Sequence, residues 1–174
     1  MCLIIDANMY GVVFSEDGPR RFPRLYSWIE DSQEKVVYGG SQVREEIRNS
    51  RSAVRQLSVW DQAALTREVP DEAVDNHAAS LRQRGGLASN DAHYLALARV
   101  SGSRVICTDD SDLRDDFTNP GIIGNPKGRV YSESNATDFQ GPQHRCDRNA
   151  CTDSRACRKR AQGRLAARKR QRGP

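Results

Sequence analysis

The residues best suited to chemistry in this chain are aspartates that directly follow short apolar runs. Asp6 comes immediately after the run at 2–5, and a group of aspartates follows the run at 104–107. The members of that later group are Asp109, Asp110 and Asp112. Short continuous apolar runs are typical of strands buried on both faces, and open parallel sheets bind ligands beyond the carboxyl ends of their strands. The sequence therefore predicts that two strands deliver carboxylates to one edge of a sheet.

Further acidic residues belong to predicted helices. Asp91 opens a helix just before the second apolar run, and Glu45 or Glu46 lies in the first turns of a helix that follows Gly39-Gly40. Two unit charges about 4 Å apart repel by roughly 4 kcal/mol at an effective dielectric constant of 20. A fold keeps four such groups at one rim only if a cation neutralises them or if some of the acids are protonated.

Oxygen ligands without histidine or cysteine suit Mg²⁺ or Mn²⁺ rather than Zn²⁺. Such a metal serves phosphate-ester hydrolysis, because it lowers the pKa of a bound water, orients the phosphate and offsets charge on the leaving oxygen. Each acid alone has a simpler explanation. Asp6 is also explained as a strand end, Asp91 as a first-turn acid favoured by the helix dipole, and the glutamates as solvated helix charges. Their order and combination favour a site.

Strands and helices alternate along the chain. Strands are expected at 2–5, 35–38 and 104–107, with short late strands at 122–123 and 129–131. Helices are expected at 24–31, 41–57, 71–84 and 91–100, where apolar residues recur at helical spacing or glycines mark the end. Strands separated by helices predict an α/β fold with a central parallel sheet that is covered on both faces.

Charge divides the chain into two unlike parts. Residues 140–174 contain eleven Lys and Arg against two Asp, which leaves 1–139 with 16 basic and 21 acidic residues and a net charge of −5. Phe139 is the last aromatic residue, and Leu165 is the only large aliphatic residue after it. Such a segment cannot bury enough apolar surface to offset its ordering entropy, on the order of 1–2 kcal/mol per residue. We expect a domain at 1–139 and a disordered basic tail at 140–174.

Composition also bears on location. The longest apolar runs are about half of the ~20 residues that a membrane span needs, so no membrane partner is expected. The N-terminus lacks a basic region and has Asp6 where a signal peptide would continue its apolar stretch. Five cysteines, an odd number, argue against a disulfide framework in a chain without an export signal. A reducing cytoplasm is therefore expected.

Four short motifs hold the acids in a particular order. They are Leu3-Ile4-Ile5-Asp6-Ala7-Asn8, Val43-Arg44-Glu45-Glu46-Ile47, Asn90-Asp91-Ala92-His93-Tyr94-Leu95-Ala96-Leu97-Ala98, and Val105-Ile106-Cys107-Thr108-Asp109-Asp110-Ser111-Asp112-Leu113. This order resembles that of the PIN domain family, named from the PilT N-terminus, and particularly its toxin ribonucleases. The resemblance covers about residues 3–131. Its second motif is the least specific.

The resemblance implies a three-layer α/β/α fold and a metal-dependent endoribonuclease that leaves 5′-phosphate and 3′-hydroxyl ends. The family usually places its glutamate just before an aliphatic residue, which selects Glu46 over Glu45, and its Thr-x-Asp-x-Asp pattern selects Asp110, with Asp109 as the alternative. The catalytic acids so implied are Asp6, Glu46, Asp91 and Asp110, and the implied ligands of one or two Mg²⁺ or Mn²⁺ are Asp6, Asp91, Asp110 and, as an accessory, Asp112. Asn8 and Thr108 are supporting residues that would fix a carboxylate or touch the phosphate.

Partners follow from the same resemblance. It implies an RNA substrate, an antitoxin protein whose C-terminal segment fills the site, and a homodimer. An apolar helix bearing Phe22, Leu25, Trp28 and Ile29 could join two copies, although packing on the sheet explains the same residues.

The basic tail suits phosphate contacts, which give affinity without sequence choice and weaken steeply with salt. The residues assigned to nucleic-acid binding are Arg158, Lys159, Arg160, Arg168, Lys169 and Arg170. A solubilising extension is the alternative. His144 and three nearby cysteines would make four zinc ligands, but their spacing fits no common zinc site.

Two other functions compete with the nuclease. The first is a catalytically silent PIN-like protein that binds RNA or acts as a scaffold. The second is another phosphate-handling α/β domain, a receiver or a haloacid-dehalogenase-like phosphatase. The phosphatase needs a second Asp two positions after its nucleophile, where this chain has Asn8, and a receiver would depend on Lys127 as its only candidate lysine. Neither explains the acid at the start of the Asp91 helix.

Overall fold

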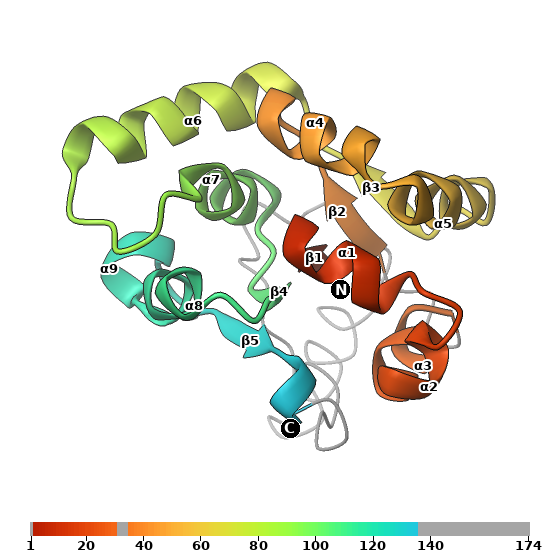
Figure 1. Ribbon diagram of the computed structural model, residues 1–174. Helices are drawn as coiled ribbons and strands as arrows, with labels where there is room; N and C mark the ends of the chain where they lie inside the picture. The colour runs from red at the N-terminus through yellow and green to blue at the C-terminus, as the bar shows by residue number, and fades with distance from the viewer. Residues whose placement is uncertain (1, 31–34, 136–174) are drawn as a thin grey trace, which may run out of the picture.

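The computed structural model describes residues 2–30 and 35–135 as an α/β fold around a five-stranded sheet. The strands are β1 (Cys2–Ile5), β2 (Lys35–Tyr38), β3 (Thr66–Glu68), β4 (Val105–Cys107) and β5 (Arg129–Tyr131). Their order in the sheet is β3-β2-β1-β4-β5, and every neighbouring pair is parallel, which confirms the predicted fold class (Figure 1). The boundary at 139 and the tail at 140–174 lie outside the described residues.

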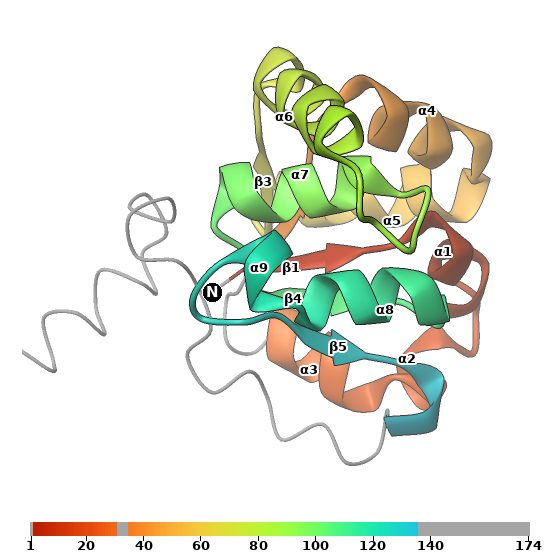
Figure 2. The same cartoon turned by 90° about the vertical axis from the view of Figure 1, so that its left-hand side faces the viewer.

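Helices cover both faces of the sheet and make the three layers. The helices are α1 (Ala7–Val13), α2 (Gly18–Arg21), α3 (Pro23–Glu30), α4 (Ser41–Asn49), α5 (Arg51–Gln62), α6 (Asp71–Arg84), α7 (Ala92–Ser101), α8 (Ser111–Thr118) and α9 (Pro120–Ile123), followed by a short 3₁₀ turn at Glu133–Asn135. Helices α2, α3 and α5 lie on one side, and α7, α8 and α9 lie on the other, with α6 packed outside α7 (Figures 1 and 2). No helix within the described ranges combines the length and the apolar character needed to cross a membrane.

The two central strands set the position of the acidic residues. Strands β1 and β4 are buried along their whole length, as their apolar sequences predict. Ile4 pairs with Ile106 and Ile5 with Cys107, so both strands end at the same level. The backbone N–H of Asp6 then donates to the carbonyl of Cys107 at 3.0 Å. The residues that follow β1 and β4 therefore start side by side at the carboxyl edge.

The face covered by α2, α3 and α5 is filled by aromatic and aliphatic side chains. The Trp60 ring meets Phe14 edge-on at a centroid distance of 5.4 Å and lies 5.6 Å from Tyr26. Four residues considered for contact between copies are buried in this core: Phe22, Leu25, Trp28 and Ile29. Their apolar character serves packing on the sheet, which is the alternative that the sequence offered to contact between copies.

Several element boundaries differ from the sequence-based expectation. The helix expected at 41–57 is two helices, because Ser50 has extended dihedral angles (φ −113°, ψ 105°) and caps α5. Residues 122–123, expected as a strand, end the short helix α9, which Asn119 caps and Pro120 begins. Helix α1 and strand β3 were not expected; β3 reads Thr-Arg-Glu at the sheet edge and has no apolar pattern to reveal it.

The cap at Ser50 gives a prediction for stability. Its hydroxyl accepts the N–H of Ala53 at 3.3 Å, so Ser50→Ala is expected to lower the free energy of unfolding by about 1 kcal/mol. Urea denaturation followed by circular dichroism measures the loss. Ser58→Ala, an exposed position inside the same helix, is the control and is expected to be neutral or slightly stabilising. Equal effects of the two substitutions would contradict the capping role.

Candidate active site

Asp6 is a buried carboxylate held between two elements. It caps the N-terminus of α1, where its Oδ1 accepts the backbone N–H of Asn8 at 3.2 Å. Its Oδ2 accepts the hydroxyl of Thr108 at 2.5 Å, and only 2% of the residue is exposed. The Asn8 side chain itself is exposed, so the described contact of Asn8 with this site is through its backbone.

Thr108 connects Asp6 to the next acid. The Thr108 hydroxyl donates to Asp6 and accepts the backbone N–H of Asp110 at 3.0 Å. Asp110 in turn caps α8, with its Oδ1 accepting the N–H of Leu113 at 2.7 Å. One threonine therefore fixes both the side-chain orientation of Asp6 and the backbone from which Asp110 projects.

The neighbours of Asp110 are placed differently. Asp109 is exposed, and its Oδ1 accepts the backbone N–H of Glu133 at 3.1 Å. Asp109 therefore holds the segment after β5 against the end of β4. Asp112 is exposed in the first turn of α8. Of these three aspartates, Asp110 is the one whose charge raises the pKa of Asp91.

Glu46 lies on the inner side of α4, where α7 meets it. Its Oε2 accepts the hydroxyl of Tyr94 at 2.7 Å, and its Oε1 lies 3.2 Å from Nε2 of His93. Within the described structure, both ring nitrogens of His93 are buried and neither has a partner in hydrogen-bond geometry. The contact between His93 and Glu46 is therefore a short distance without a well-aligned hydrogen bond. Glu45 is exposed on the other side of α4. The structure thus brings Glu46, and not Glu45, to the other acids.

Tyr94 joins Glu46 to the strand end that carries Asp6. Its hydroxyl oxygen accepts the backbone N–H of Ala7 at 2.8 Å while its proton is donated to Glu46. Burial keeps the pKa of Tyr94 well above its ordinary value of 10.0, so the hydroxyl stays protonated and able to donate. A single buried side chain therefore contacts the elements that hold Asp6 and Glu46, and it stands one turn into the helix that Asp91 begins.

Asp91 begins α7 and is half-buried. It is the N-cap residue, and its own backbone N–H donates to the hydroxyl of Ser89 at 2.9 Å. Burial raises the pKa of Asp91, His93 lowers it, and the charges of Glu46 and Asp110 raise it again, with a raised value as the net result. All three side chains are therefore close enough to Asp91 for their charges to act on it.

The carboxylates of the site do not share one electrostatic environment. Burial raises the pKa of Asp6, the hydrogen bonds from Thr108 and Asn8 oppose this, and the charges of Asp91 and Glu46 add to the rise. Burial also raises the pKa of Glu46, but the contacts with His93 and Tyr94 outweigh it, and the net shift is downward. In the absence of a cation, Glu46 is therefore the more readily ionised group, and the two aspartates resist ionisation.

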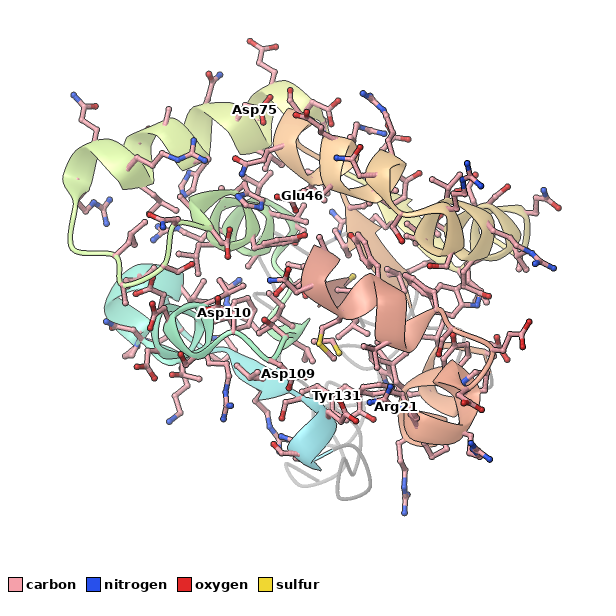
Figure 3. All side chains as sticks on the ribbon, viewed as in Figure 1. Arg21, Glu46, Asp75, Asp109, Asp110 and Tyr131 are labelled. Carbon is pink, nitrogen blue, oxygen red and sulfur yellow. The ribbon has the colours of Figure 1, made fainter. Side chains whose placement is uncertain are left out.

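The structure thus gathers acids from four separate parts of the chain at one edge of the sheet: Asp6, Glu46, Asp91 and Asp110. Figure 3 shows Glu46 on α4 above α1 and Asp110, before α8, to the left of α1. In the part of the chain that the structure describes, no three His, Cys, Asp or Glu side chains form a ready metal-ligand group. The donors that are present are carboxylate and hydroxyl oxygens, the type that Mg²⁺ and Mn²⁺ prefer. A divalent cation would also relieve the repulsion that adds to the effect of burial in raising the pKa values of Asp6 and Asp91.

Sequence reasoning missed two residues at this site. His93 was given no role from the sequence, yet it is 1% exposed, because most of α7 is buried between the sheet and α6. Tyr94 carried no signal except its place three positions after Asp91, close to one helical turn. The six basic residues assigned to nucleic-acid binding at 158–160 and 168–170 lie outside the described residues.

Comparison with known proteins gives one match. The family model described as PIN domain matches residues 19–116, more than half of the chain. The matched segment includes Glu46, Asp91 and Asp110, whereas Asp6 precedes it. No curated protein and no solved structure matches the chain.

Proposed function

Because the chain belongs to the PIN domain family, whose members are generally nucleases, we propose that it is a metal-dependent endoribonuclease. The observation that carries the proposal is a set of hydrogen bonds that link acids from distant parts of the chain. Thr108 bonds both the Asp6 carboxylate and the backbone of Asp110, and the Tyr94 hydroxyl bonds both Glu46 and the backbone that follows Asp6. The charges of Glu46 and Asp110 act on Asp91, and those of Glu46 and Asp91 act on Asp6. A fold that holds such groups together suits a divalent metal.

Asp6, Asp91 and Asp110 are the proposed ligands of Mg²⁺ or Mn²⁺, directly or through water, with Asp112 as an accessory at the rim. The bound metal would lower the pKa of a water molecule and offset charge on the phosphate. Glu46, whose pKa is lowered, stays ionised and can accept a proton from that water. Thr108 holds the Asp6 carboxylate in place, which limits reorganisation when a substrate binds.

The direct test incubates purified protein with labelled RNA and Mn²⁺ or Mg²⁺, and in parallel with EDTA. Cleavage with the metal that stops with EDTA, and products that carry 5′-phosphate and 3′-hydroxyl ends, are expected. The Asp91→Asn protein, purified in the same way, is required because contaminating ribonucleases cut RNA without metal. Equal cleavage by the wild type and by Asp91→Asn would contradict the assignment of Asp91 to the active site.

A second candidate is a catalytically silent PIN-like protein that binds RNA. The observation that favours it is the lack of a ready three-residue metal-ligand group in the described ranges. RNA binding that persists in EDTA, together with no cleavage at any Mn²⁺ or Mg²⁺ concentration, would support this candidate over the nuclease.

The finer biological role proposed for the nuclease is that of a toxin in a toxin–antitoxin pair in the cytoplasm. Its support is the resemblance of the four acidic motifs to toxin members of the family. Such a role predicts growth arrest on expression, relief of that arrest by a cognate antitoxin, and no arrest by the Asp91→Asn variant. Arrest that is independent of Asp91 would contradict it. A homodimer is proposed on the same ground, and sedimentation of the purified protein tests it.

The basic tail supplies a prediction for substrate binding. The domain at 1–139 carries a net charge of −5, so it repels RNA unless the tail compensates. Deleting 140–174 is expected to weaken RNA binding and to reduce the slope of log K against log salt by about 0.7 for each phosphate group that the tail neutralises. Filter binding across a salt series measures both quantities. An unchanged affinity and slope would show that the tail does not touch RNA.

A further inference from the structure

Asp116 is a buried carboxylate that the proposed chemistry does not use. It lies on α8 with 4% of its surface exposed. Its Oδ1 accepts the backbone N–H of Ala88 at 3.1 Å, and its Oδ2 accepts that of Ser89 at 2.9 Å. Within the described residues no Lys, Arg or His forms an ion pair with it. Both oxygens are therefore committed to the backbone of the loop between α6 and α7.

This loop leads directly to a proposed metal ligand. The Ser89 hydroxyl accepts the backbone N–H of Asp91 at 2.9 Å, and Asp91 is the N-cap of α7. Asp110, another proposed metal ligand, is the N-cap of α8, the helix that carries Asp116. A continuous path of hydrogen bonds and one helix thus runs from Asp110 through Asp116 and Ser89 to Asp91.

The Asp110 carboxylate is held locally as the cap of α8, whereas Asp91 is held through its backbone at the start of α7. What local structure cannot fix is the position of α7 relative to α8, and that position decides the separation of the Asp91 and Asp110 carboxylates. The Asp116 carboxylate bonds the loop before α7 to α8 with two hydrogen bonds to one rigid group. An amide of the same shape has only one oxygen to accept them, and its NH₂ group would face an N–H donor.

Asp116 is buried, and its two backbone hydrogen bonds offset the cost of removing its polar atoms from water. Charged acceptors form shorter and stronger hydrogen bonds than neutral ones. We propose that Asp116 is a positioning residue that sets the separation of Asp91 and Asp110 and thereby the affinity of the site for a divalent cation. The inference rests on the proposed metal-dependent function.

The test measures Mn²⁺ binding to the full-length, metal-free protein by isothermal titration calorimetry. Asp116→Asn is expected to weaken Mn²⁺ binding about tenfold, within the 10–100-fold range known for residues that orient metal ligands. Ser89→Ala removes only the second link, the acceptor for the Asp91 N–H, and is expected to weaken binding severalfold. It keeps the proposal testable if the Asp116 variant does not fold.

Asn119→Ala is the matched control. Asn119 follows α8 and accepts the N–H of Gly121 at 2.9 Å, so its loss removes a backbone hydrogen bond that does not lead to the acids. It is expected to lower the unfolding temperature and to leave Mn²⁺ affinity unchanged. Normal Mn²⁺ binding by both site variants, or an equal loss in the control, would overturn the positioning role.

The outcome separates this inference from the proposed function. A wild-type protein that binds Mn²⁺ but does not cut RNA would refute the nuclease, while weaker Mn²⁺ binding by Asp116→Asn would still support the positioning role. Cleavage by the wild type together with unchanged Mn²⁺ binding in both site variants would refute the positioning role alone. A wild-type protein that binds no Mn²⁺ would refute both.

Discussion

Asp6→Asn is expected to abolish divalent-dependent RNA cleavage while raising the unfolding temperature of the metal-free protein. The two effects have one cause. Asp6 is 2% exposed and lies within the influence of the charges on Asp91 and Glu46. An amide removes the buried charge and the repulsion, but it also removes an anionic oxygen that a cation needs. Loss of a single charge-stabilising group in an active site slows a reaction by roughly a hundredfold or more.

The same substitution should change how stability depends on pH. The pKa of Asp6 in the folded protein is raised above its ordinary value of 3.8, so the folded state binds the proton more tightly than the unfolded state. Stability is then fully present below the ordinary pKa and is lost as the pH rises through the raised one. In metal-free buffer, the wild type is therefore expected to lose stability over that interval, and the Asp6→Asn variant to lose less.

Thermal unfolding in EDTA across a pH series measures this difference, and cleavage of labelled RNA with Mn²⁺ measures the first effect. Asp115→Asn is the matched control, since it removes an exposed aspartate of α8 that has no described contact with the site. It is expected to keep wild-type cleavage and the wild-type pH dependence. Full activity of Asp6→Asn would falsify the assigned site, and a lower unfolding temperature would show that the Asp6 charge is stabilising.

The sequence predicted the parts of the fold that depend on local patterns. Strands β1 and β4 are short apolar runs followed directly by acids, and their parallel pairing aligns their ends, so the meeting of these acids at one edge follows the sequence pattern. Helix α6 was predicted at its observed bounds, because Gly85-Gly86 ends it and both glycines have positive φ. The strands and the helix end are recognised from local sequence, and the general geometry of parallel sheets brings the strand ends to one edge.

The contacts that complete the site could not be predicted in this way. Tyr94 and Glu46 are 48 residues apart, and Ser89 and Asp116 are 27 apart, so their hydrogen bonds depend on how helices pack against one another. Helical spacing places Asp116, but not Asp115, on the face of α8 that carries Leu113 and Phe117, so its burial follows from the local pattern. Its partners in the loop before α7 appear only when the layers are assembled.

Tyr94→Phe is expected to lower both stability and cleavage, because it removes one oxygen that serves two partners. Without it, the N–H of Ala7 loses its acceptor and Glu46 loses a donor at 2.7 Å. A buried polar group left without a partner costs about 1–3 kcal/mol. The pKa of Glu46 should also rise toward its ordinary value, since the Tyr94 hydrogen bond is one of the contacts that lower it.

Tyr26→Phe separates the effect on the site from the effect on stability. It makes the same chemical change and removes a buried hydrogen bond, the one from the Tyr26 hydroxyl to the carbonyl of Val13 at 2.6 Å, in the core beside α5. Both variants should unfold at lower urea concentrations than the wild type. Only Tyr94→Phe should also lose cleavage, by about tenfold, as expected when a residue that orients an active-site carboxylate is removed. Equal cleavage by the two variants would mean that Tyr94 stabilises the fold without orienting Glu46.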